Sequence, residues 1–373
     1  MSDVPQLSVG DSMKPFSAPT QAGSEWTPGD VVGKPLVLFF YLRDDAPACA
    51  TQACAFRDLY GEFTALGVTV VGVGIDTPES HAAFAARHNL PYRLLSDRNA
   101  RVSLLYGAAR PEGREEESRQ TIAMGRRTIL FGPDFRVAKV YDDVRPETHA
   151  AEVLADVRKL LTRDEPRQIV RHAPVLLIPD VLPPGVCARM IEVWETQGNE
   201  DSGFMRQVEG KTVGMLDYDH KIRRDHFVRR GSETDALLKK YIGPRVIPEI
   251  ERAFNYQATR YEDFRIACYD SARGGYFRPH RDNTTDGTAH RRFAMSLLLN
   301  DGYDGGNLRF PEFGGHLYKP DAGGAVIFSC SLLHEATDVT AGRRFVLLSF
   351  LYGEAEARRR EEYNRRVGGD YRA

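Results

Sequence analysis

The pattern of apolar residues changes once along this chain of 373 residues, and that change constrains the fold more than any other feature. In the first part, continuous apolar runs at 35–42 and 68–75 alternate with helical stretches at 51–66 and 78–88. Continuously apolar strands that alternate with helices are typical of a layered α/β sheet. After residue 260, short strands are separated by Gly-rich turns, which favours a β-sandwich or jelly roll. The sequence therefore predicts two domains of different classes.

The polar segment 161–173 separates the two patterns and is rich in charged residues. A chain of 373 residues is long enough for two domains that each bury a substantial core. We predict a first domain over 1–162, a linker over 163–173, a second domain over 174–353 and a charged tail over 354–373. The tail is most simply a solvated helix, and an interaction tail is the alternative.

Composition narrows the kinds of partner that the chain can bind. The net charge of −2 gives no global attraction to nucleic acid or to an anionic membrane surface. We expect no secretory signal and no membrane span, because the sequence has no apolar run of the required kind or length. The five cysteines are odd in number and lack scaffold-like spacing, which favours a reducing cytoplasm and reactive rather than structural thiols.

The densest run of basic residues lies at 221–230, where four Arg and one Lys stand against one Asp. We interpret this run as a solvated face, with an acidic partner as the alternative. No aromatic-rich basic stripe accompanies it, so we do not expect a nucleic-acid substrate. Other residues that we assign to the surface or to a rim are His220, His226, His290 and His316, whereas Cys268 and Cys330 are expected in the core.

Four residues of the second half have the order and spacing of an iron site. His280 and Asp282 are two positions apart, so on a strand their side chains share a face. His334 would complete a two-His-one-carboxylate triad, which leaves coordination positions open and is typical of non-heme Fe(II) oxygenases. The guanidinium of Arg344 suits a carboxylate co-substrate, whereas strand alternation points Arg343 to the opposite face.

Longer motifs surround these residues in a recognisable order. They are Tyr269-x4-Gly274-Gly275-x-Phe277-x2-His280-x-Asp282, Gly305-Gly306-x-Leu308-x-Phe310 and His334-Glu335-x3-Val339-x2-Gly342-x-Arg344. The segment from about 174 to 353 therefore resembles the prolyl 4-hydroxylase-like branch of the 2-oxoglutarate/Fe(II)-dependent dioxygenases. The resemblance implies a double-stranded β-helix (jelly-roll, α+β) fold.

The same resemblance implies the roles of the site residues. Fe(II) would be held by His280, Asp282 and His334, Arg344 would bind the distal carboxylate of 2-oxoglutarate, and Tyr269 would hydrogen-bond that co-substrate. It also implies O2 as the second co-substrate, L-ascorbate as the reductant that rescues over-oxidised iron, and hydroxylation of a C–H bond. Prolyl residues in proteins, free amino acids and small natural products all fit as substrates. We expect substrate contacts from the loops around 203–225 and 284–290.

The first half contains a pair of cysteines at an informative spacing. Cys49 follows a buried strand and precedes a helix, where free backbone N–H groups lower a thiol pKa. Cys54 lies five residues later, roughly 7.5 Å further along a helix. A disulfide cannot bridge that distance without movement. A Cys49–Cys54 disulfide therefore requires local unwinding of the first helical turns.

Four motifs are distributed over residues 1–160, and one of them contains the two cysteines. They are Gly10-Asp11-x3-Pro15-Phe16, Cys49-x4-Cys54-x-Phe56-Arg57-Asp58, Gly72-Val73-Gly74-Ile75-Asp76-x2-Glu79-Ser80-His81 and Asn89-Leu90-Pro91-x3-Leu95-Ser96-Asp97. The segment resembles the atypical two-Cys peroxiredoxins of the bacterioferritin comigratory protein type. The resemblance implies an α/β thioredoxin-like fold and a thioredoxin- or glutaredoxin-like reductant.

By this resemblance Cys49 is the peroxidatic cysteine, Cys54 the resolving one, and Arg126 the guanidinium near the peroxide, with Arg127 as the other candidate. The chain departs from the family motif at two positions, since Leu42 and Ala46 stand where the family has Pro and Thr. Loss of the Thr hydroxyl should weaken transition-state stabilisation.

We therefore predict an oxidoreductase in which a peroxiredoxin-like thiol domain precedes a 2-oxoglutarate-dependent dioxygenase. Two alternatives stay open for the first domain. It either senses redox state without reducing peroxide, or it is an inactive thioredoxin-like scaffold that binds a protein partner or substrate.

Overall fold

The computed structural model describes residues 7–112, 121–142, 144–161 and 168–367. The chain divides into two compact units, residues 1–166 and 167–373. The predicted linker 163–173 lies partly outside the described residues; its last residue, Ala173, is buried in the second unit. No helix in the described part of the chain has the length and apolar character needed to cross a bilayer.

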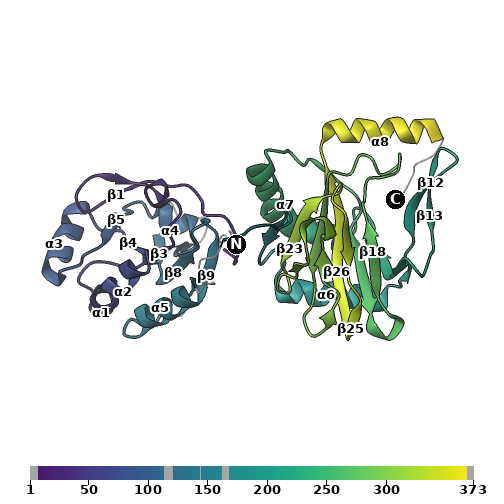
Figure 1. The fold of residues 1–373 in the computed structure, drawn as a ribbon. Coiled ribbons are helices and arrows are strands. Elements are labelled where there is room, and N and C mark those ends of the chain that lie inside the picture. The colour runs from purple at the N-terminus through teal and green to yellow at the C-terminus, as the bar shows by residue number, and fades with distance from the viewer. Residues whose placement is uncertain (1–6, 113–120, 143, 162–167, 368–373) are drawn as a thin grey trace. The chain divides into compact units, whose positions relative to one another are not determined.

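The first unit is built on a five-stranded sheet of order β5-β4-β3-β8-β9 (Figure 1). The strands β3, β4 and β5 are parallel, and β8 and β9 form an antiparallel hairpin. Their bounds are Leu36–Phe40 (β3), Thr69–Gly74 (β4), Arg93–Ser96 (β5), Arg127–Phe131 (β8) and Val137–Tyr141 (β9).

The central strand β3 is buried on both faces, as its continuous apolar run predicted. Val37 and Phe39 pack into one apolar cluster, whereas Leu36, Leu38 and Phe40 pack into another. This arrangement is the predicted thioredoxin-like α/β fold. The helices are α1 (Pro47–Asp58), α2 (Tyr60–Ala65), α3 (Pro78–His88), α4 (Arg101–Leu105) and α5 (His149–Leu160). The shorter elements are β1 (Ala18–Pro19), β2 (Glu25–Trp26), a 3-10 turn (Pro28–Val31), β6 (Ala109–Glu112) and β7 (Thr121–Met124).

The helix predicted over 51–66 is wrong in its bounds. It begins earlier, at Pro47, whose fixed φ suits the first helical position, and it breaks at Leu59 into α1 and α2. The break lets Leu59, Tyr60 and Phe63 all pack against the same apolar cluster. The earlier start places Cys49 in the first turn of α1, whereas the sequence analysis placed it just before the helix.

The second unit contains two facing antiparallel sheets, the arrangement of a double-stranded β-helix (Figure 1). The larger sheet has the order β10-β23-β19-β26-β17-β15-β11, with β16 also paired to β26. Its strands are β10 (Leu176–Ile178), β11 (Glu200–Asp201), β15 (Arg224–Phe227), β16 (Arg260–Tyr261), β17 (Arg265–Asp270), β19 (Phe293–Leu298), β23 (Ala325–Ser329) and β26 (Arg343–Tyr352).

The smaller sheet has the order β14-β18-β24-β21-β22. Its strands are β14 (Lys221–Ile222), β18 (Tyr276–His280), β21 (Leu308–Arg309), β22 (Leu317–Tyr318) and β24 (His334–Ala336). Two further pairs are β12 (Phe204–Val208) with β13 (Lys211–Met215), and β20 (Asp304–Gly305) with β25 (Val339–Ala341). Together, the two units confirm the predicted fold classes.

Three helices accompany the sheets of the second unit: α6 (Pro184–Thr196), α7 (Glu233–Phe254) and α8 (Glu354–Val367). The tail helix α8 is only partly solvated, because Tyr363 is buried and its hydroxyl accepts a hydrogen bond from the Thr212 amide. Residues 368–373 lie outside the described residues.

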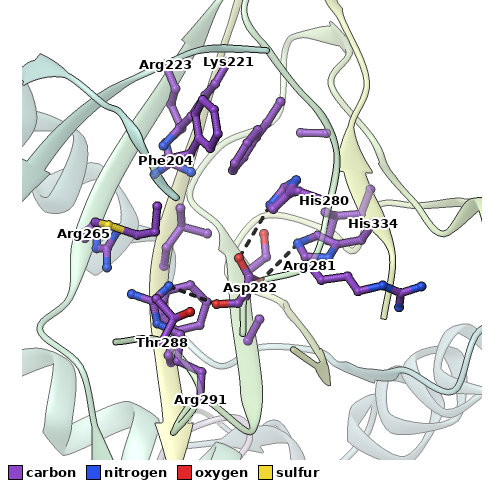
Figure 2. Close-up of a pocket in the computed structure, with 18 of the residues that line it drawn as sticks. Phe204, Lys221, Arg223, Arg265, His280, Arg281, Asp282, Thr288, Arg291 and His334 are labelled. Atoms are coloured by element: carbon purple, nitrogen blue, oxygen red, sulfur yellow. Dashed lines mark hydrogen bonds and ion pairs between the residues drawn. The ribbon is translucent and has the colours of Figure 1, made fainter. Parts of the chain in front are cut away.

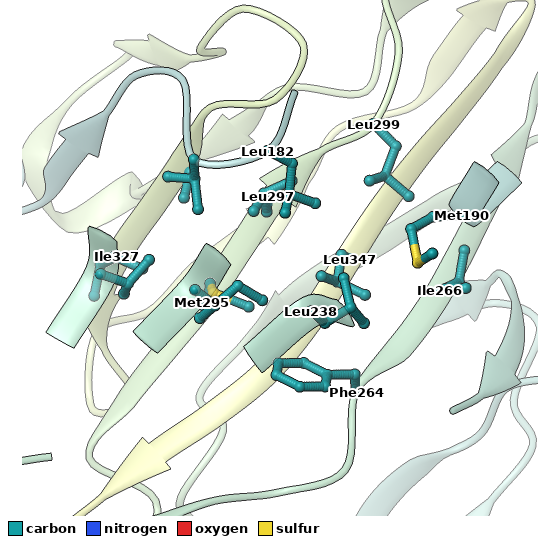
Figure 3. Close-up of a cluster of buried hydrophobic side chains, with 14 of the residues drawn as sticks. Leu182, Met190, Leu238, Phe264, Ile266, Met295, Leu297, Leu299, Ile327 and Leu347 are labelled. Carbon is teal, nitrogen blue, oxygen red and sulfur yellow. The ribbon is translucent and has the colours of Figure 1, made fainter. Parts of the chain in front are cut away.

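The main core of the second unit lies between the larger sheet and the helices α6 and α7 (Figure 3). Met190 of α6 and Leu238 of α7 are fully buried against strand residues such as Met295 and Leu347. This packing fixes β26, and therefore Arg344 at its start, against the rest of the sheet.

Replacing Leu347 by alanine should destabilise the second unit by about 3 kcal/mol, because a fully buried leucine leaves a cavity. Urea denaturation followed by circular dichroism would measure the loss as a lower midpoint. Leu317→Ala is the control, since Leu317 is exposed and should change stability by less than about 0.5 kcal/mol. Equal effects of the two substitutions would contradict this assignment of the core.

Candidate functional site

A cavity of about 320 Å³ opens in the second unit, lined from both sheets (Figure 2). Phe277 and His280 of β18 and Ala336 of β24 contribute from the smaller sheet. Arg344 and Leu348 of β26 contribute from the larger one. The cavity therefore lies inside the double-stranded β-helix, where side chains from distant parts of the sequence meet.

His280, Asp282 and His334 form one cluster in this cavity, with potential ligand atoms within 4.8 Å of one another. The strands β18 and β24 pair so that His280 lies opposite His334. Asp282 lies between them, with Oδ1 3.6 Å from Nε2 of His280 and Oδ2 3.3 Å from Nε2 of His334 (Figure 2). The structure thus brings together the three residues that the sequence assigned to a metal.

Both imidazoles are oriented by backbone carbonyl groups. Nδ1 of His280 lies 2.8 Å from the carbonyl oxygen of Arg278, and Nδ1 of His334 lies 2.9 Å from that of Leu332. A carbonyl only accepts, so each Nδ1 carries the proton and each Nε2 presents a lone pair towards Asp282. Fixing the tautomer through the other ring nitrogen is how proteins orient metal-ligating histidines.

The protonation states of the cluster suit a cation. Burial, together with the neighbouring His334, lowers the pKa of His280 to about 4. The pKa of Asp282 lies well below its usual value: burial opposes ionisation, but the influence of the neighbouring His334 and His280 outweighs that effect. At neutral pH the cluster therefore offers a neutral His280 beside an ionised carboxylate, as a divalent metal requires.

Arg344 is a buried guanidinium with no carboxylate in ion-pair contact among the described residues. Its Nε has no hydrogen-bond partner, and its guanidinium carbon lies 5.0 Å from the centre of the Tyr269 ring on β17. Gly306 makes room for it, because a Cβ there would come within 2.7 Å of Arg344 Cδ. A buried, unpaired guanidinium is costly, so this position fits the free carboxylate of a ligand.

Arg343 lies on the opposite face of β26, as strand alternation predicted. It is exposed and pairs with Glu195, with Nη2 and Oε1 2.9 Å apart.

The interpretation of 221–230 as a solvated face is wrong for its first half, whereas Arg229 and Arg230 are exposed as expected. Strands β14 and β15 turn Lys221, Arg223 and Asp225 inwards, and each is less than a tenth exposed. Arg223 and Asp225 are held by a buried ion pair of 2.6 Å, and Arg223 also donates to the Tyr269 hydroxyl at 3.3 Å. Burial opposes ionisation of Asp225, but Arg223 lowers the carboxyl pKa to about 2.

The surface assignment of His290 is also wrong. Its Nε2 lies 2.9 Å from Glu262, a buried carboxylate that also accepts hydrogen bonds from Arg291 and Arg265. Of this cluster, Arg265 and Arg291 line the cavity. His220 lines the cavity and His316 is exposed, as expected.

In the first unit, Cys49 is buried in the first turn of α1, and Nη2 of Arg126 lies 3.5 Å from its sulfur. Arg127 instead donates to the Tyr106 carbonyl and pairs with Asp142. The structure therefore places the first of the two candidate arginines beside Cys49. Ala46, at the helix N-cap, provides no side-chain hydroxyl there.

Cys54 lies on α1 as well, but its sulfur has different neighbours. Nη1 of Arg57 lies 3.3 Å away, and Nδ1 of His88, at the end of α3, lies 3.7 Å away. All five cysteines are free thiols in this structure.

The geometry of the two units defines a thiol-based thioredoxin-like domain and an iron oxygenase domain, and the comparisons with known proteins agree. The AhpC/TSA family matches residues 9–140, and the 2OG-Fe(II) oxygenase superfamily matches residues 264–352. A bcp-type peroxiredoxin of Coxiella burnetii is 33% identical over 148 residues, 40% of this chain and 97% of that protein. Peroxiredoxin Q of Sedum lineare is 35% identical over 156 residues, 42% of this chain and 80% of the relative.

Among solved structures, peroxidoxin BcpB from Mycobacterium tuberculosis is 30% identical, with a TM-score of 0.39, and the match covers 43% of this chain and all of that one. The chain belongs to the AhpC/TSA peroxiredoxin family through its first unit and carries a 2OG-Fe(II) oxygenase domain in its second. Both are families of enzymes.

Proposed function

We propose that the second unit is an Fe(II)- and 2-oxoglutarate-dependent hydroxylase of the prolyl 4-hydroxylase-like kind. The observation that carries this proposal is the combination of the His280–Asp282–His334 cluster with the unpaired guanidinium of Arg344 in one cavity. A divalent metal and a dicarboxylic acid would satisfy both features.

Each residue of the cavity has a separate proposed role. Iron would be held by Nε2 of His280, Nε2 of His334 and the carboxylate of Asp282. When bound, Fe(II) supplies the oxygen chemistry that couples decarboxylation of 2-oxoglutarate to hydroxylation of a C–H bond. Arg344 would bind the distal carboxylate, and Tyr269 would orient the co-substrate through its hydroxyl. L-Ascorbate would keep the iron reduced.

The apolar wall of the cavity serves the same reaction by excluding water. Phe277 stacks on the His280 ring with centroids 3.4 Å apart, and Phe328 packs on His334 at 4.6 Å. Leu308 and Leu348 complete this wall. Such packing restricts the two imidazoles to one orientation and keeps solvent from the reacting atoms.

Replacing His334 by alanine should abolish 2-oxoglutarate turnover, because two ligands hold Fe(II) far more weakly than three. The assay follows succinate release by the aerobic protein with Fe(II), 2-oxoglutarate and ascorbate. His316→Ala is the matched control, since His316 is exposed and lies outside the cavity lining. Full turnover by the His334 variant would contradict the proposed site.

We further propose that the first unit reduces peroxides through Cys49, with Cys54 as the resolving thiol. Support comes from the position of Cys49 at a helix N-terminus with a guanidinium 3.5 Å away, which stabilises a thiolate. A thioredoxin- or glutaredoxin-like protein would reduce the resulting disulfide, in keeping with a reducing cytoplasm. We propose that the thiol domain spans residues 1–162 and the oxygenase domain residues 174–353.

The absence of a hydroxyl at Ala46 favours one rival, in which the thiol pair senses redox state and regulates the oxygenase. Under that rival, oxidation to the Cys49–Cys54 disulfide changes the rate of succinate release while peroxide consumption stays negligible. Measuring both rates on one preparation distinguishes the two functions.

A further inference from the structure

We propose that the oxygenase cavity contains a second anion site at Lys221, and that the substrate is a small molecule with a free carboxylate. This proposal rests on the proposed oxygenase function and deepens it by naming the substrate class. It excludes an internal prolyl residue of a protein, whose amide groups carry no charge.

The argument begins with the charges that line the cavity. Seven cationic side chains line it, and Asp282 is its one carboxylate among the described residues. Five of the cations are paired with carboxylates behind the wall: Arg206 with Asp217, Arg223 with Asp225, Arg265 and Arg291 with Glu262, and Arg281 with Glu312. In the described structure, Lys221 and Arg344 are the two lining cations that have no ion pair.

Lys221 is 4% exposed, so bulk solvent screens its charge only weakly. Its Nζ donates to the Ser202 hydroxyl at 2.7 Å and to the Gly203 carbonyl at 2.6 Å, which leaves one of three protons free. The Phe277 ring lies 4.8 Å away. Burial, reinforced by the charge of Arg223, lowers the pKa of Lys221 well below its usual value, so its ammonium form lacks a sufficient counter-charge in the protein. A ligand carboxylate would supply that counter-charge.

Arg223 reinforces this end of the cavity, because its Nη2 also donates to the Ser202 hydroxyl, at 3.2 Å. Figure 2 shows Lys221 and Arg223 together, with Phe204 beside them. The co-substrate occupies one anion site, since its distal carboxylate goes to Arg344 and its other end to the metal. A second carboxylic acid, the substrate, would then pair with Lys221. The neighbouring rings of Phe204 and Phe277 would contact the apolar part of that molecule.

The test uses the full chain with Fe(II) and 2-oxoglutarate, and compares free L-amino acids and simple carboxylic acids with their uncharged amides. We expect at least one acid to accelerate succinate release and its amide not to do so. Lys221→Met should raise the half-saturating concentration of that acid by about 30-fold or more, because a buried charge partner is lost. Lys211→Met is the matched control, since Lys211 is exposed on β13.

The charge-transfer band of the anaerobic Fe(II)–2-oxoglutarate complex distinguishes failure of the second anion site from failure of the proposed oxygenase function. We expect its 2-oxoglutarate dependence to be unchanged in Lys221→Met. If that variant loses affinity for 2-oxoglutarate instead, Lys221 serves the co-substrate and the proposal is overturned. It is also overturned if no acid in the panel exceeds its amide. Absence of the band in the unmodified protein would contradict the oxygenase function itself.

A different observation, in the first unit, carries a second inference: we infer that His88 is the general base for Cys54 and that Asp45 positions it. This inference rests on the proposed thiol chemistry. Nδ1 of His88 lies 3.7 Å from the Cys54 sulfur, and Nε2 lies 3.4 Å from Oδ1 of Asp45. The carboxylate accepts, so the ring proton is on Nε2 and the Nδ1 lone pair faces the thiol.

Other charged and polar groups surround Cys54 and His88. Nη1 of Arg57 lies 3.3 Å from the Cys54 sulfur, and the same atom donates to the His88 carbonyl at 2.9 Å. Arg87 pairs with the second oxygen of Asp45. The other titratable neighbours of Cys54 and Arg57 are Tyr92 and Asp58.

The proposed reaction forms the disulfide between Cys54 and Cys49. His88 takes the proton of the Cys54 thiol, and the thiolate attacks the sulfenic acid that peroxide has formed on Cys49. The S–S bond forms and the S–O bond breaks, so the Cys54 sulfur is oxidised and the Cys49 sulfur reduced. The leaving hydroxide takes the proton from His88 and departs as water. Proton transfer precedes the unwinding of α1 that brings the two sulfurs together.

A single-turnover experiment tests His88. The reduced full chain is mixed with one equivalent of hydrogen peroxide, trapped with an alkylating reagent at set times, and resolved by mass spectrometry. At pH 6.5 we expect His88→Gln to form sulfenic acid at the normal rate and the disulfide about 10- to 100-fold more slowly. At pH 9 the difference should vanish, because a free thiol of pKa about 8.5 then ionises unaided.

Asp45→Asn should give a smaller loss with the same rescue at high pH. A deficit that is the same at both pH values would mean that His88 acts structurally, and an undiminished rate at pH 6.5 would exclude it as the base. If the unmodified protein forms no sulfenic acid on Cys49, the proposed peroxidase function fails instead.

Discussion

Replacing Arg344 by methionine is expected to weaken 2-oxoglutarate binding by about 100- to 1000-fold, or roughly 3–4 kcal/mol. The reason is that the guanidinium of Arg344 is 2% exposed, has no carboxylate partner among the described residues, and would pair with the distal carboxylate. Methionine keeps the apolar volume of the side chain and removes the charge. Anaerobic titration of the Fe(II)-loaded variant with 2-oxoglutarate would give the dissociation constant.

The adjacent residue provides the control. Arg343→Met removes the same charge from the next position of β26, but that guanidinium is exposed and pairs with Glu195. We expect its 2-oxoglutarate affinity to stay within about twofold, because exposed ion pairs contribute little. Equal losses in the two variants would show that net charge, rather than a specific pair, governs binding and would contradict the assignment of Arg344.

Replacing Cys49 by serine is expected to lower the rate of peroxide consumption by at least about 1000-fold, because a serine hydroxyl is not ionised at neutral pH and is a poor nucleophile. Stopped-flow measurement with a thiol reductant in excess would record the rate. Cys54→Ser should keep the first turnover and accumulate sulfenic acid on Cys49.

Cys187→Ser is the matched control for this series. Burial raises the pKa of the Cys187 thiol to about 11, so it stays protonated and unreactive at neutral pH. We expect no change in peroxide consumption. A Cys49 variant that still consumes peroxide at the normal rate would contradict the proposed peroxidase function of the first unit.

The residues of the candidate metal and co-substrate sites were the easiest part of the molecule to predict from the sequence. Pairing of β18 with β24 brings His280 and His334 opposite each other, and Asp282 lies two residues beyond the end of β18. The opposite orientations of Arg343 and Arg344 follow from the alternation of side chains along one strand. The alternation along β26 is a local signal, whereas His334 lies 54 positions from His280 and was assigned from the order and spacing of the motif.

The long helix α7 was not predicted, and its composition explains why. Pro244 and Pro248 lie inside it, and proline normally argues against a helix interior. Packing of Leu238, Ile242 and Val246 into the main core outweighs that penalty. The N-cap Ser232, which accepts from the Asp235 amide, was the local signal that could have indicated its start.

Burial of the charged residues around the cavity was also missed. Glu262 neutralises Arg291 from 29 positions away in sequence, so neither residue shows a partner in a local window. A dense basic run therefore looked solvated, although strand alternation turns Lys221 and Arg223 inwards. The contribution of His88 to the resolving thiol was hidden for the same reason, since it lies 34 positions from Cys54.

The most direct test of the central claim is an anaerobic titration of the metal-free protein with Fe(II) and 2-oxoglutarate, followed in the visible region. The account predicts a weak charge-transfer band from the bidentate keto-acid complex, and its loss in the His280→Ala and Asp282→Ala variants. An intact, folded protein that shows no band would contradict the assignment of the second unit as a 2-oxoglutarate-dependent oxygenase.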